Sequence, residues 1–347
     1  MDVIMGGPGR YIQGSGALQR LAGYMKGWGE KPFVMATPGA RARTEKYIPD
    51  SWIYARFGGE CSEEEVERLL IDFRAAGCDS VLGIGGGKCL DAAKAVAHRA
   101  GVPVGIVPTS AATDAPCSAV SIMYTPDGVM ERVVRYPESP RMVLLDTDII
   151  SKAPMRLLIS GMGDALATYF EARACAAAGV KNEFGGAPSA SCLALAKLCY
   201  DILLSDGPKA KAELEGGAAG EAVGRIIEAT TYLSGVGFES GGIAGSHAVH
   251  NALTALPETH SLYHGEKVAF GVQVQLMLEG AEEYGPVREF CKKVGLPTSF
   301  AELGITEVTR EKLFPVAEGA CADTMQNMPF EISAEMIYDA MLKVDKG

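Results

Sequence analysis

The segment Val81–Asp91 reads VLGIGGGKCLD and gives the strongest indication of the fold. A short apolar run leads into three consecutive glycines and then into an amphipathic stretch, which predicts a buried strand, a tight loop and a helix. The first N–H groups of a helix are unpaired and carry partial positive charge, and glycine lets a phosphate approach the backbone closely. The segment therefore predicts a dinucleotide-binding loop, although a tight turn without a ligand would use the same residues.

This loop departs from two well-known phosphate-binding patterns. The P-loop pattern requires glycine where Leu82 stands and serine or threonine where Cys89 stands. The pattern G-x-G-x-x-G requires glycine where Lys88 stands. The prediction therefore depends on the strand–loop–helix context as much as on the glycines.

Apolar runs and amphipathic stretches alternate across residues 1–150. Strands are predicted at Phe33–Ala36, Ile53–Phe57, Val81–Ile84, Val104–Val107, Val120–Tyr124 and Met142–Leu145, and helices at Glu63–Ala76 and Leu90–Ala100. The turn signal Pro126–Gly128 and a charged stretch predict a hairpin-like excursion between the last two strands. Strands that alternate with helices indicate a parallel sheet flanked by helices.

Residues 151–347 have a different character, rich in alanine, leucine, glutamate and methionine at helical spacing. Helices are predicted at 151–178, 188–204, 217–234, 243–255, 265–284 and 286–293, punctuated by Pro257, Pro286, Pro297 and Pro315. A chain of 347 residues is long enough for two domains. We therefore expect an α/β domain over residues 1–150 and an all-helical domain over residues 151–347, with a cleft between them.

Composition and charge exclude several classes of partner. The net charge of −11 argues against a nucleic acid or an anionic membrane surface. No stretch approaches the roughly 18 apolar residues of a membrane span, and the N-terminus lacks the pattern of a signal peptide. The nine cysteines include no C-x-x-C pair and do not suggest a disulfide framework. These features predict a protein of the reducing cytoplasm.

Four of the five histidines lie between His247 and His264. His247 and His250 are three residues apart and so share a helix face, and His264 immediately precedes another predicted helix. Two imidazoles from different helices, together with a carboxylate, would form the three-ligand site with an open fourth position that catalytic zinc uses. The cluster predicts a metal site, but spacing alone does not select its members.

Candidate carboxylates occur in two other segments. Asp164 follows two glycines at the start of a helical run, and Glu171 is a weaker candidate two turns later on the same face. An aspartate in a first helical turn is also a common cap, so the residues alone do not assign the ligand. Asp114 follows a predicted strand, where open α/β sheets bind ligands, but it could equally cap a turn.

Taken together, these segments resemble the glycerol dehydrogenase branch of the iron-containing (type III) alcohol dehydrogenase family, nearly from end to end. The shared motifs are GECS at 59–62, GIGGGK-x-LD at 83–91, PT-x-A-x-TDAP-x-S at 108–118, GMGDALATYFEA at 161–172, HAVHN at 247–251 and YHGEKVAFG at 263–271. Their occurrence in this order is highly specific. The resemblance implies a dehydroquinate synthase-like fold, with a dinucleotide-binding α/β domain and a helical, metal-binding catalytic domain.

The resemblance also implies roles for individual residues. Asp164, His247 and His264 are implied as metal ligands, and Asp114 as a carboxylate beside the substrate hydroxyls. Thr168 stands where other branches carry a fourth, histidine ligand, which favours Zn²⁺ over Fe²⁺. The residues implied to contact the dinucleotide are Gly85, Gly86, Gly87, Lys88, Asp91, Thr109, Ala112, Ser118, Val120 and Tyr124. His250 is a candidate proton relay, with a packed interhelix histidine as the alternative.

One position departs from the family. Thr37 stands where glycerol dehydrogenases usually carry an acidic residue that binds the adenosine ribose, and Arg41 and Arg43 follow it. An acidic group would repel a 2′-phosphate, whereas threonine and arginine could accept one. We therefore expect NAD as the cofactor, with NADP accepted to a measurable degree.

The implied reaction is the reversible oxidation of a secondary hydroxyl group of a small polyol such as glycerol, with hydride transfer to nicotinamide. One alternative is the reduction of a 2-oxo acid or another small carbonyl compound, although the charge of Asp114 would repel an anionic acid. Another is a non-catalytic, nucleotide-binding relative. Because the family often forms rings or larger assemblies, a homo-oligomer is expected.

Overall fold

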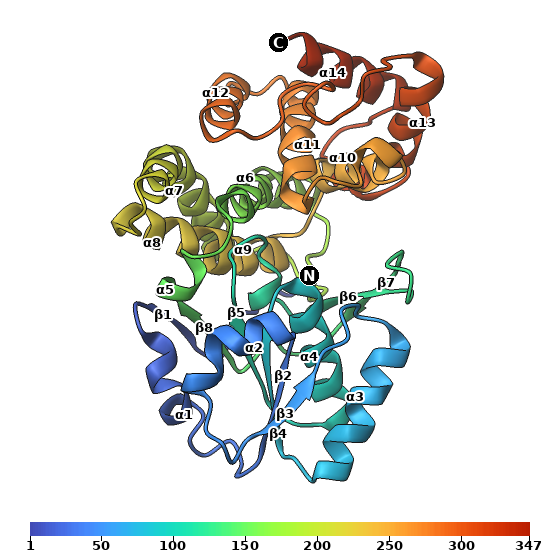
Figure 1. The fold of residues 1–347 in the computed structure, drawn as a ribbon. Helices are drawn as coiled ribbons and strands as arrows, with labels where there is room; N and C mark the ends of the chain where they lie inside the picture. Colours follow the sequence, from blue (N-terminus) through green and yellow to red (C-terminus); the bar gives the residue numbers. More distant parts are fainter. The chain divides into compact units, whose positions relative to one another are not determined.

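A computed structural model describes residues 1–347 and divides them into two compact units. The α/β unit contains Gly6–Ala111 and Ala115–Pro154. The helical unit contains Met155–Gly347 together with two short segments, Met1–Met5 and Ala112–Asp114. The predicted fold class, a parallel α/β domain followed by a helical domain, is confirmed (Figure 1).

The α/β unit is built on a six-stranded parallel sheet of order β1-β8-β5-β4-β2-β3. Its strands are β1 (Tyr11–Gly14), β2 (Pro32–Ala36), β3 (Ile53–Arg56), β4 (Ser80–Gly85), β5 (Val104–Pro108) and β8 (Met142–Asp146). Strands β2, β4 and β8 are buried along their whole length, because helices and loops cover both faces of a parallel sheet. Only β1 was not predicted, since YIQG contains no apolar run.

Two faces of β4 show how the helices pack. Leu82 belongs to an apolar cluster with residues of α1 (Leu21–Tyr24) and α2 (Pro38–Thr44). Gly83 points to the opposite face, where a side chain would come within 2.6 Å of Ala93 in α4 (Gly87–Ala100). Glycine at position 83 therefore lets α4 lie directly on the sheet. Helices α3 (Glu63–Ala76) and α5 (Thr147–Ile150) complete the unit.

The predicted excursion is an antiparallel hairpin of β6 (Val120–Tyr124) and β7 (Met130–Arg135). The charged stretch itself forms the second strand. The hairpin is a separate two-stranded sheet and does not join the parallel one.

The helical unit contains nine α-helices. They are α6 (Met155–Ala178), α7 (Ala190–Glu215), α8 (Glu221–Glu228), α9 (Ser234–Gly241), α10 (Gly245–Leu253), α11 (His264–Glu279), α12 (Tyr284–Val294), α13 (Arg310–Cys321) and α14 (Ala334–Lys346). The predicted helix over 217–234 is wrong in its later part, because a π-helix over Ala229–Leu233 follows α8 and leads into α9. Helices α13 and α14 were not predicted.

Two of the four prolines that were expected to separate helices lie within α-helices instead. Pro286 is in the first turn of α12, where a helix needs no N–H donor. Pro315 is inside α13, whose side chains Leu313, Val316 and Ala317 are buried in the apolar core. Tertiary packing thus stabilises this helix despite the missing hydrogen bond.

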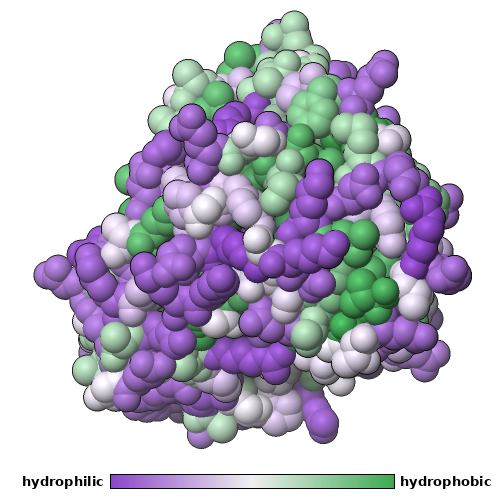
Figure 2. Space-filling model, turned by 90° about the horizontal axis from the view of Figure 1, so that it is seen from above, coloured by the Kyte–Doolittle hydropathy of each residue, from purple (hydrophilic) through white to green (hydrophobic).

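The surface drawn in Figure 2 is a mixture of hydrophilic and hydrophobic residues. No helix of the structure combines the length and the apolar character that crossing a bilayer requires.

Candidate metal centre

Helix α11 packs so closely against α6 and α10 that backbone atoms of the facing helices are in contact. A side chain at Gly163 or Gly265 would collide with the facing helix, since Gly163 packs on the carbonyl of Gly265 and Gly265 on that of Ser160. Gly271 of α11 packs in the same way on the carbonyl of Ser246 in α10. These contacts lie one residue away from Asp164, His264 and His247, respectively, so that helix packing at glycine brings the three side chains together.

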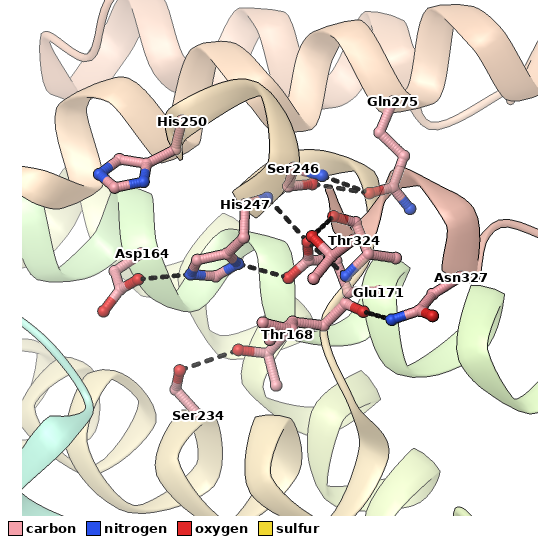
Figure 3. A network of polar contacts seen from close by, with 12 residues as sticks. Asp164, Thr168, Glu171, Ser234, Ser246, His247, His250, Gln275, Thr324 and Asn327 are labelled. Atoms are coloured by element: carbon pink, nitrogen blue, oxygen red, sulfur yellow. Dashed lines mark hydrogen bonds and ion pairs between the residues drawn. The ribbon is translucent and has the colours of Figure 1, made fainter. Parts of the chain in front are cut away.

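Asp164, His247 and His264 form one compact group of metal-binding atoms. Their ligand atoms all lie within 4.8 Å of one another. Oδ1 of Asp164 is 3.0 Å from Nε2 of His264 and 3.6 Å from Nε2 of His247. Figure 3 shows Asp164 and His247 facing each other. Two imidazoles and one carboxylate suit a divalent transition metal such as zinc, and three protein ligands leave a position for substrate.

Glu171 lies behind His247 and is not a member of this group. Its Oε2 is 2.6 Å from Nδ1 of His247, and its Oε1 accepts hydrogen bonds from the backbone N–H groups of Ala244 and His247, each at 2.9 Å (Figure 3). A carboxylate accepts a hydrogen bond from Nδ1–H of an imidazole, so the proton stays on Nδ1 and Nε2 of His247 is left to face Asp164. Glu171, the weaker ligand candidate in the sequence, therefore orients a ligand.

The electrostatics of the group favour a cation. Burial raises the pKa of Asp164, but His264 and His247 outweigh this effect and lower the pKa below the usual range. Burial lowers the pKa of His247, but Glu171 and Asp164 outweigh it and raise the pKa well above its ordinary value. The negative charge of Asp164, which favours a proton on His247, can favour a metal cation in its place.

His250 lies next to the group but offers it no ligand atom. Its ring centroid is 4.1 Å from that of His264, and Nδ1 is 2.9 Å from Oδ1 of Asn251. Burial, together with His264 and His247, lowers the pKa of His250 well below its ordinary value, so the ring is neutral. His260 is exposed, and its Nε2 lies 3.0 Å from the carbonyl oxygen of Thr254.

Asp114 joins the metal group from another part of the chain. Its backbone N–H donates to Oδ2 of Asp164 at 3.3 Å, and its own Oδ2 accepts a hydrogen bond from Ser234 at 2.6 Å. Oγ1 of Thr168 lies 2.8 Å from Oγ of Ser234, so Thr168 belongs to this hydroxyl chain and not to the ligand group. Burial and the charge of Asp164 raise the pKa of Asp114 well above its usual range. Sequence reasoning missed Ser234, which no motif marks.

The glycine loop lies at the end of β4. In the sheet, Ala36 pairs with Ile84 and Gly85 with Pro108, so Thr37, Gly86 and Thr109 leave the sheet at the same edge. A side chain at Gly86 or Gly87 would meet no atom within 4 Å, and neither residue has a positive φ. Neither packing nor backbone conformation within the chain therefore requires these two glycines, as expected if the space belongs to a ligand.

The charged residues around this loop bind other parts of the α/β unit. Nζ of Lys88 is 2.6 Å from both carboxylate oxygens of Glu60 and 4.6 Å from the ring centroid of Tyr124. Asp91 is buried, and its carboxylate accepts hydrogen bonds from Ile122 N and Lys94 Nζ, each at 3.1 Å. Asp91 therefore holds the hairpin against α4.

Each of the remaining candidates for dinucleotide contact takes part in a hydrogen bond that a backbone carbonyl oxygen accepts. Thr109 N donates to the Gly85 carbonyl at 2.9 Å, Ala112 O accepts from Ser160 Oγ at 3.4 Å, Ser118 Oγ donates to Ala115 O at 3.0 Å and Val120 O accepts from Lys94 Nζ at 2.7 Å. Their contact with a dinucleotide stays a prediction, as does that of Lys88, Asp91 and Tyr124.

Thr37, where the chain departs from the family pattern, and Arg41 each contact a residue of the α/β unit. Oγ1 of Thr37 caps α2 by accepting a hydrogen bond from Ala40 N at 3.2 Å. The guanidinium of Arg41 stacks 3.9 Å from the ring centroid of Tyr54, and Arg43 is exposed.

Comparisons with known proteins agree with this architecture. Residues 8–147 match the iron-containing alcohol dehydrogenase family. The chain is 49% identical to a glycerol dehydrogenase of Escherichia coli, over 100% of this chain and 97% of the relative. It is 40% identical to a glycolaldehyde reductase of Halobacterium salinarum, over 100% and 98% of the two chains. The crystal structure of glycerol dehydrogenase from Schizosaccharomyces pombe superimposes with a TM-score of 0.94 at 36% identity, covering 99% of this chain and 91% of that one. The chain therefore belongs to the iron-containing alcohol dehydrogenase family, within its glycerol dehydrogenase branch.

Proposed function

We propose that this protein is a zinc-dependent, nicotinamide-linked dehydrogenase that oxidises a secondary hydroxyl group of a small vicinal diol, with glycerol as the expected substrate. The observation that supports this most directly is the convergence of Asp164, His247 and His264 with Asp114 beside them. The names of the relatives point to the same reaction, since one that is 49% identical is a glycerol dehydrogenase.

Each side chain of the site has a distinct task in this reaction. Asp164, His247 and His264 would hold the metal, which supplies a Lewis acid that lowers the pKa of a substrate hydroxyl group. Glu171 fixes the ring of His247 through Nδ1. Asp114 has one carboxylate oxygen occupied by Ser234, and the other is available to accept a hydrogen bond from the second hydroxyl of the diol.

We propose zinc rather than iron because the site offers three ligands. The position that would carry a fourth, Thr168, is committed to Ser234. Elemental analysis of protein purified without added metal, followed by reactivation of the apoprotein with Zn²⁺ or Fe²⁺, tests this choice.

We propose that the dinucleotide binds at the edge where β2, β4 and β5 end. The open space at Gly86 and Gly87 and the N-terminus of α4 suit a pyrophosphate. NAD is the expected cofactor. Because Thr37 at the same edge carries no negative charge to repel a 2′-phosphate, NADP should be accepted to a measurable degree.

A second candidate reaction is the reduction of a small hydroxy aldehyde, favoured by the 40% identity to a glycolaldehyde reductase. The decisive experiment measures NAD and NADP reduction with glycerol, propane-1,2-diol and propan-2-ol, and NADH oxidation with dihydroxyacetone, glycolaldehyde and pyruvate. We expect the highest kcat/KM for glycerol and dihydroxyacetone and the lowest for pyruvate. Preference for glycolaldehyde would favour the second reaction, and dinucleotide binding without turnover would indicate a non-catalytic relative.

We further propose a homo-oligomer in the cytoplasm. The nine cysteines are all free thiols, which suits a reducing compartment. Sedimentation velocity of the purified protein tests the assembly.

A further inference from the structure

A chain of two buried hydroxyl groups leads to Asp114. Ser234 donates its hydroxyl proton to Oδ2 of Asp114 at 2.6 Å. Oγ1 of Thr168 lies 2.8 Å from Ser234 Oγ (Figure 3). Because a serine hydroxyl has only one proton, Thr168 must be the donor in the second bond. Ser234 and Thr168 are 0% and 2% exposed, so water does not compete for these bonds.

The π-helix explains why a serine reaches this position. The five residues Ala229–Leu233 are wound with one extra residue per turn, which rotates the residues that follow by about 100° relative to a continuous α-helix. Ser234 is the first residue after this turn, at the start of α9. π-Turns of this kind are frequent at functional sites.

Gly237 supports the same contact. It lies three residues after Ser234 and therefore on the same face of α9. A side chain at position 237 would come within 2.6 Å of Cγ2 of Thr168 in α6. Glycine thus allows α9 to lie against α6 at Thr168, which places Ser234 between Thr168 and Asp114.

The hydrogen bonds leave Asp114 with one defined orientation. The backbone N–H is bound to Asp164, and Oδ2 is bound to Ser234. Oδ1 is therefore the oxygen left for a ligand. We propose that Ser234 is a positioning residue that holds Asp114 for the second hydroxyl of a vicinal diol, and so determines the preference for diols over monohydric alcohols. This inference rests on the proposed function.

The test compares Ser234→Ala with Thr230→Ala. Thr230 is an equally buried hydroxyl residue of the π-helix, but its hydroxyl donates to the carbonyl of Ile226, in the preceding helix α8. In Ser234→Ala we expect the KM for glycerol to rise at least about tenfold, or about 1.4 kcal/mol, while kcat changes less than about threefold. The KM for propan-2-ol and the zinc content should not change. In Thr230→Ala all four quantities should stay at the parent values.

Two further measurements connect the effect to Asp114. In a double-mutant cycle, Ser234→Ala should add nothing to the KM defect of Asp114→Ala, since both remove the same interaction. Calorimetry of glycerol binding to the zinc-loaded protein without dinucleotide should show the same loss without turnover. Ser234→Thr keeps a hydroxyl and should restore the parent KM, and Ser234→Cys, a similar shape with a weak donor, should behave like alanine.

Two outcomes would overturn the inference: equal glycerol KM values in Ser234→Ala and Thr230→Ala, or additive effects in the cycle. If Ser234→Ala does not fold, the Thr and Cys variants decide the question, and equal KM values in these two contradict it. If the parent protein oxidises no polyol, the proposed function fails instead, which the substrate panel shows before any variant is made.

Discussion

Oε2 of Glu171 lies 2.6 Å from Nδ1 of His247, and Glu171 is fully buried. The same carboxylate accepts hydrogen bonds from two backbone N–H groups at the start of α10. With one side chain, Glu171 therefore ties α6 to α10 and sets the direction of the imidazole.

Replacing Glu171 with Gln should weaken zinc binding about 10- to 100-fold, because an amide does not favour the Nδ1 proton as a carboxylate does. Competition with a chelator measures the affinity. Glu228→Gln, at an exposed position in the same unit, serves as the control and should bind zinc like the parent. Equal affinities in both variants would show that the contact only supports packing.

Replacing His264 with Ala should remove stoichiometric zinc and nearly abolish turnover, because two ligands do not hold the ion firmly. His260→Ala is the matched control, since His260 is exposed and its ring nitrogen lies near a backbone carbonyl oxygen of Thr254. Elemental analysis of both purified variants makes the comparison. Full zinc occupancy in His264→Ala would contradict the ligand assignment.

Replacing Gly86 with Val should raise the dinucleotide Kd strongly, because the side chain would fill space that is open in the structure. Zinc content should not change, since the loop and the ligands belong to different units. Fluorescence titration with NADH measures the Kd, and Gly23→Val, in an equally open position of α1, is the control. An unchanged Kd in Gly86→Val would mean that the glycine serves only the turn.

Replacing Thr37 with Asp should shift the ratio of kcat/KM values toward NAD by about tenfold or more, equivalent to about 1.4 kcal/mol. A carboxylate there would bind the ribose hydroxyls and repel a 2′-phosphate. Arg41→Ala should lower the NADP efficiency only if this arginine leaves Tyr54 to bind that phosphate. A parent enzyme already strongly selective for NAD, with a ratio that the aspartate does not move, would refute the prediction.

A further prediction concerns acid stability. Hydrogen bonds from Arg225 lower the pKa of Asp206 from 3.8 to about 2, outweighing the opposing effect of its burial. A carboxyl group with a lowered folded-state pKa contributes stability above its unfolded pKa, and this contribution is lost as the pH falls toward 2. Because Arg225 is 43% exposed, solvent screening reduces the contribution to about 1 kcal/mol.

Asp206→Asn should therefore lower the free energy of unfolding by about that amount at pH 7 and by much less near pH 2. Urea unfolding at both pH values measures the difference. Asp201→Asn breaks a pair with Lys197 in which both partners are about half exposed, and it should have no measurable effect. A loss of equal size at both pH values for Asp206→Asn would rule out the ion pair as its cause.

Local sequence signals were sufficient to predict most strands and the longer helices of the α/β unit. Helix α3 has the predicted bounds, because Ser62 caps its N-terminus and Gly77, with a φ of +63°, ends it. The buried strands of the parallel sheet were recognisable as apolar runs, because a strand that is covered on both faces carries apolar side chains on both. Strand β1 has no apolar run, and Pro315 interrupts the helical pattern of α13. Helix α14 was missed although Ser333 caps it as Ser62 caps α3.

The sequence by itself predicted a metal site among the clustered histidines and a glycine loop between a strand and a helix. The concentration of histidines and the strand–loop–helix pattern are local features and need no knowledge of the fold. It could not distinguish the roles of Asp164 and Glu171, which lie on the same face of α6.

Tertiary structure decided between these two carboxylates. The glycine contact of α6 with α11 sets Asp164 opposite His264. Two turns later, Glu171 lies on the far side of the His247 ring, at Nδ1. Ser234 became visible in the same way, because its partner Asp114 is 120 residues away and an added π-turn sets the direction of its hydroxyl. Such contacts depend on how helices pack, which no local pattern of residues records.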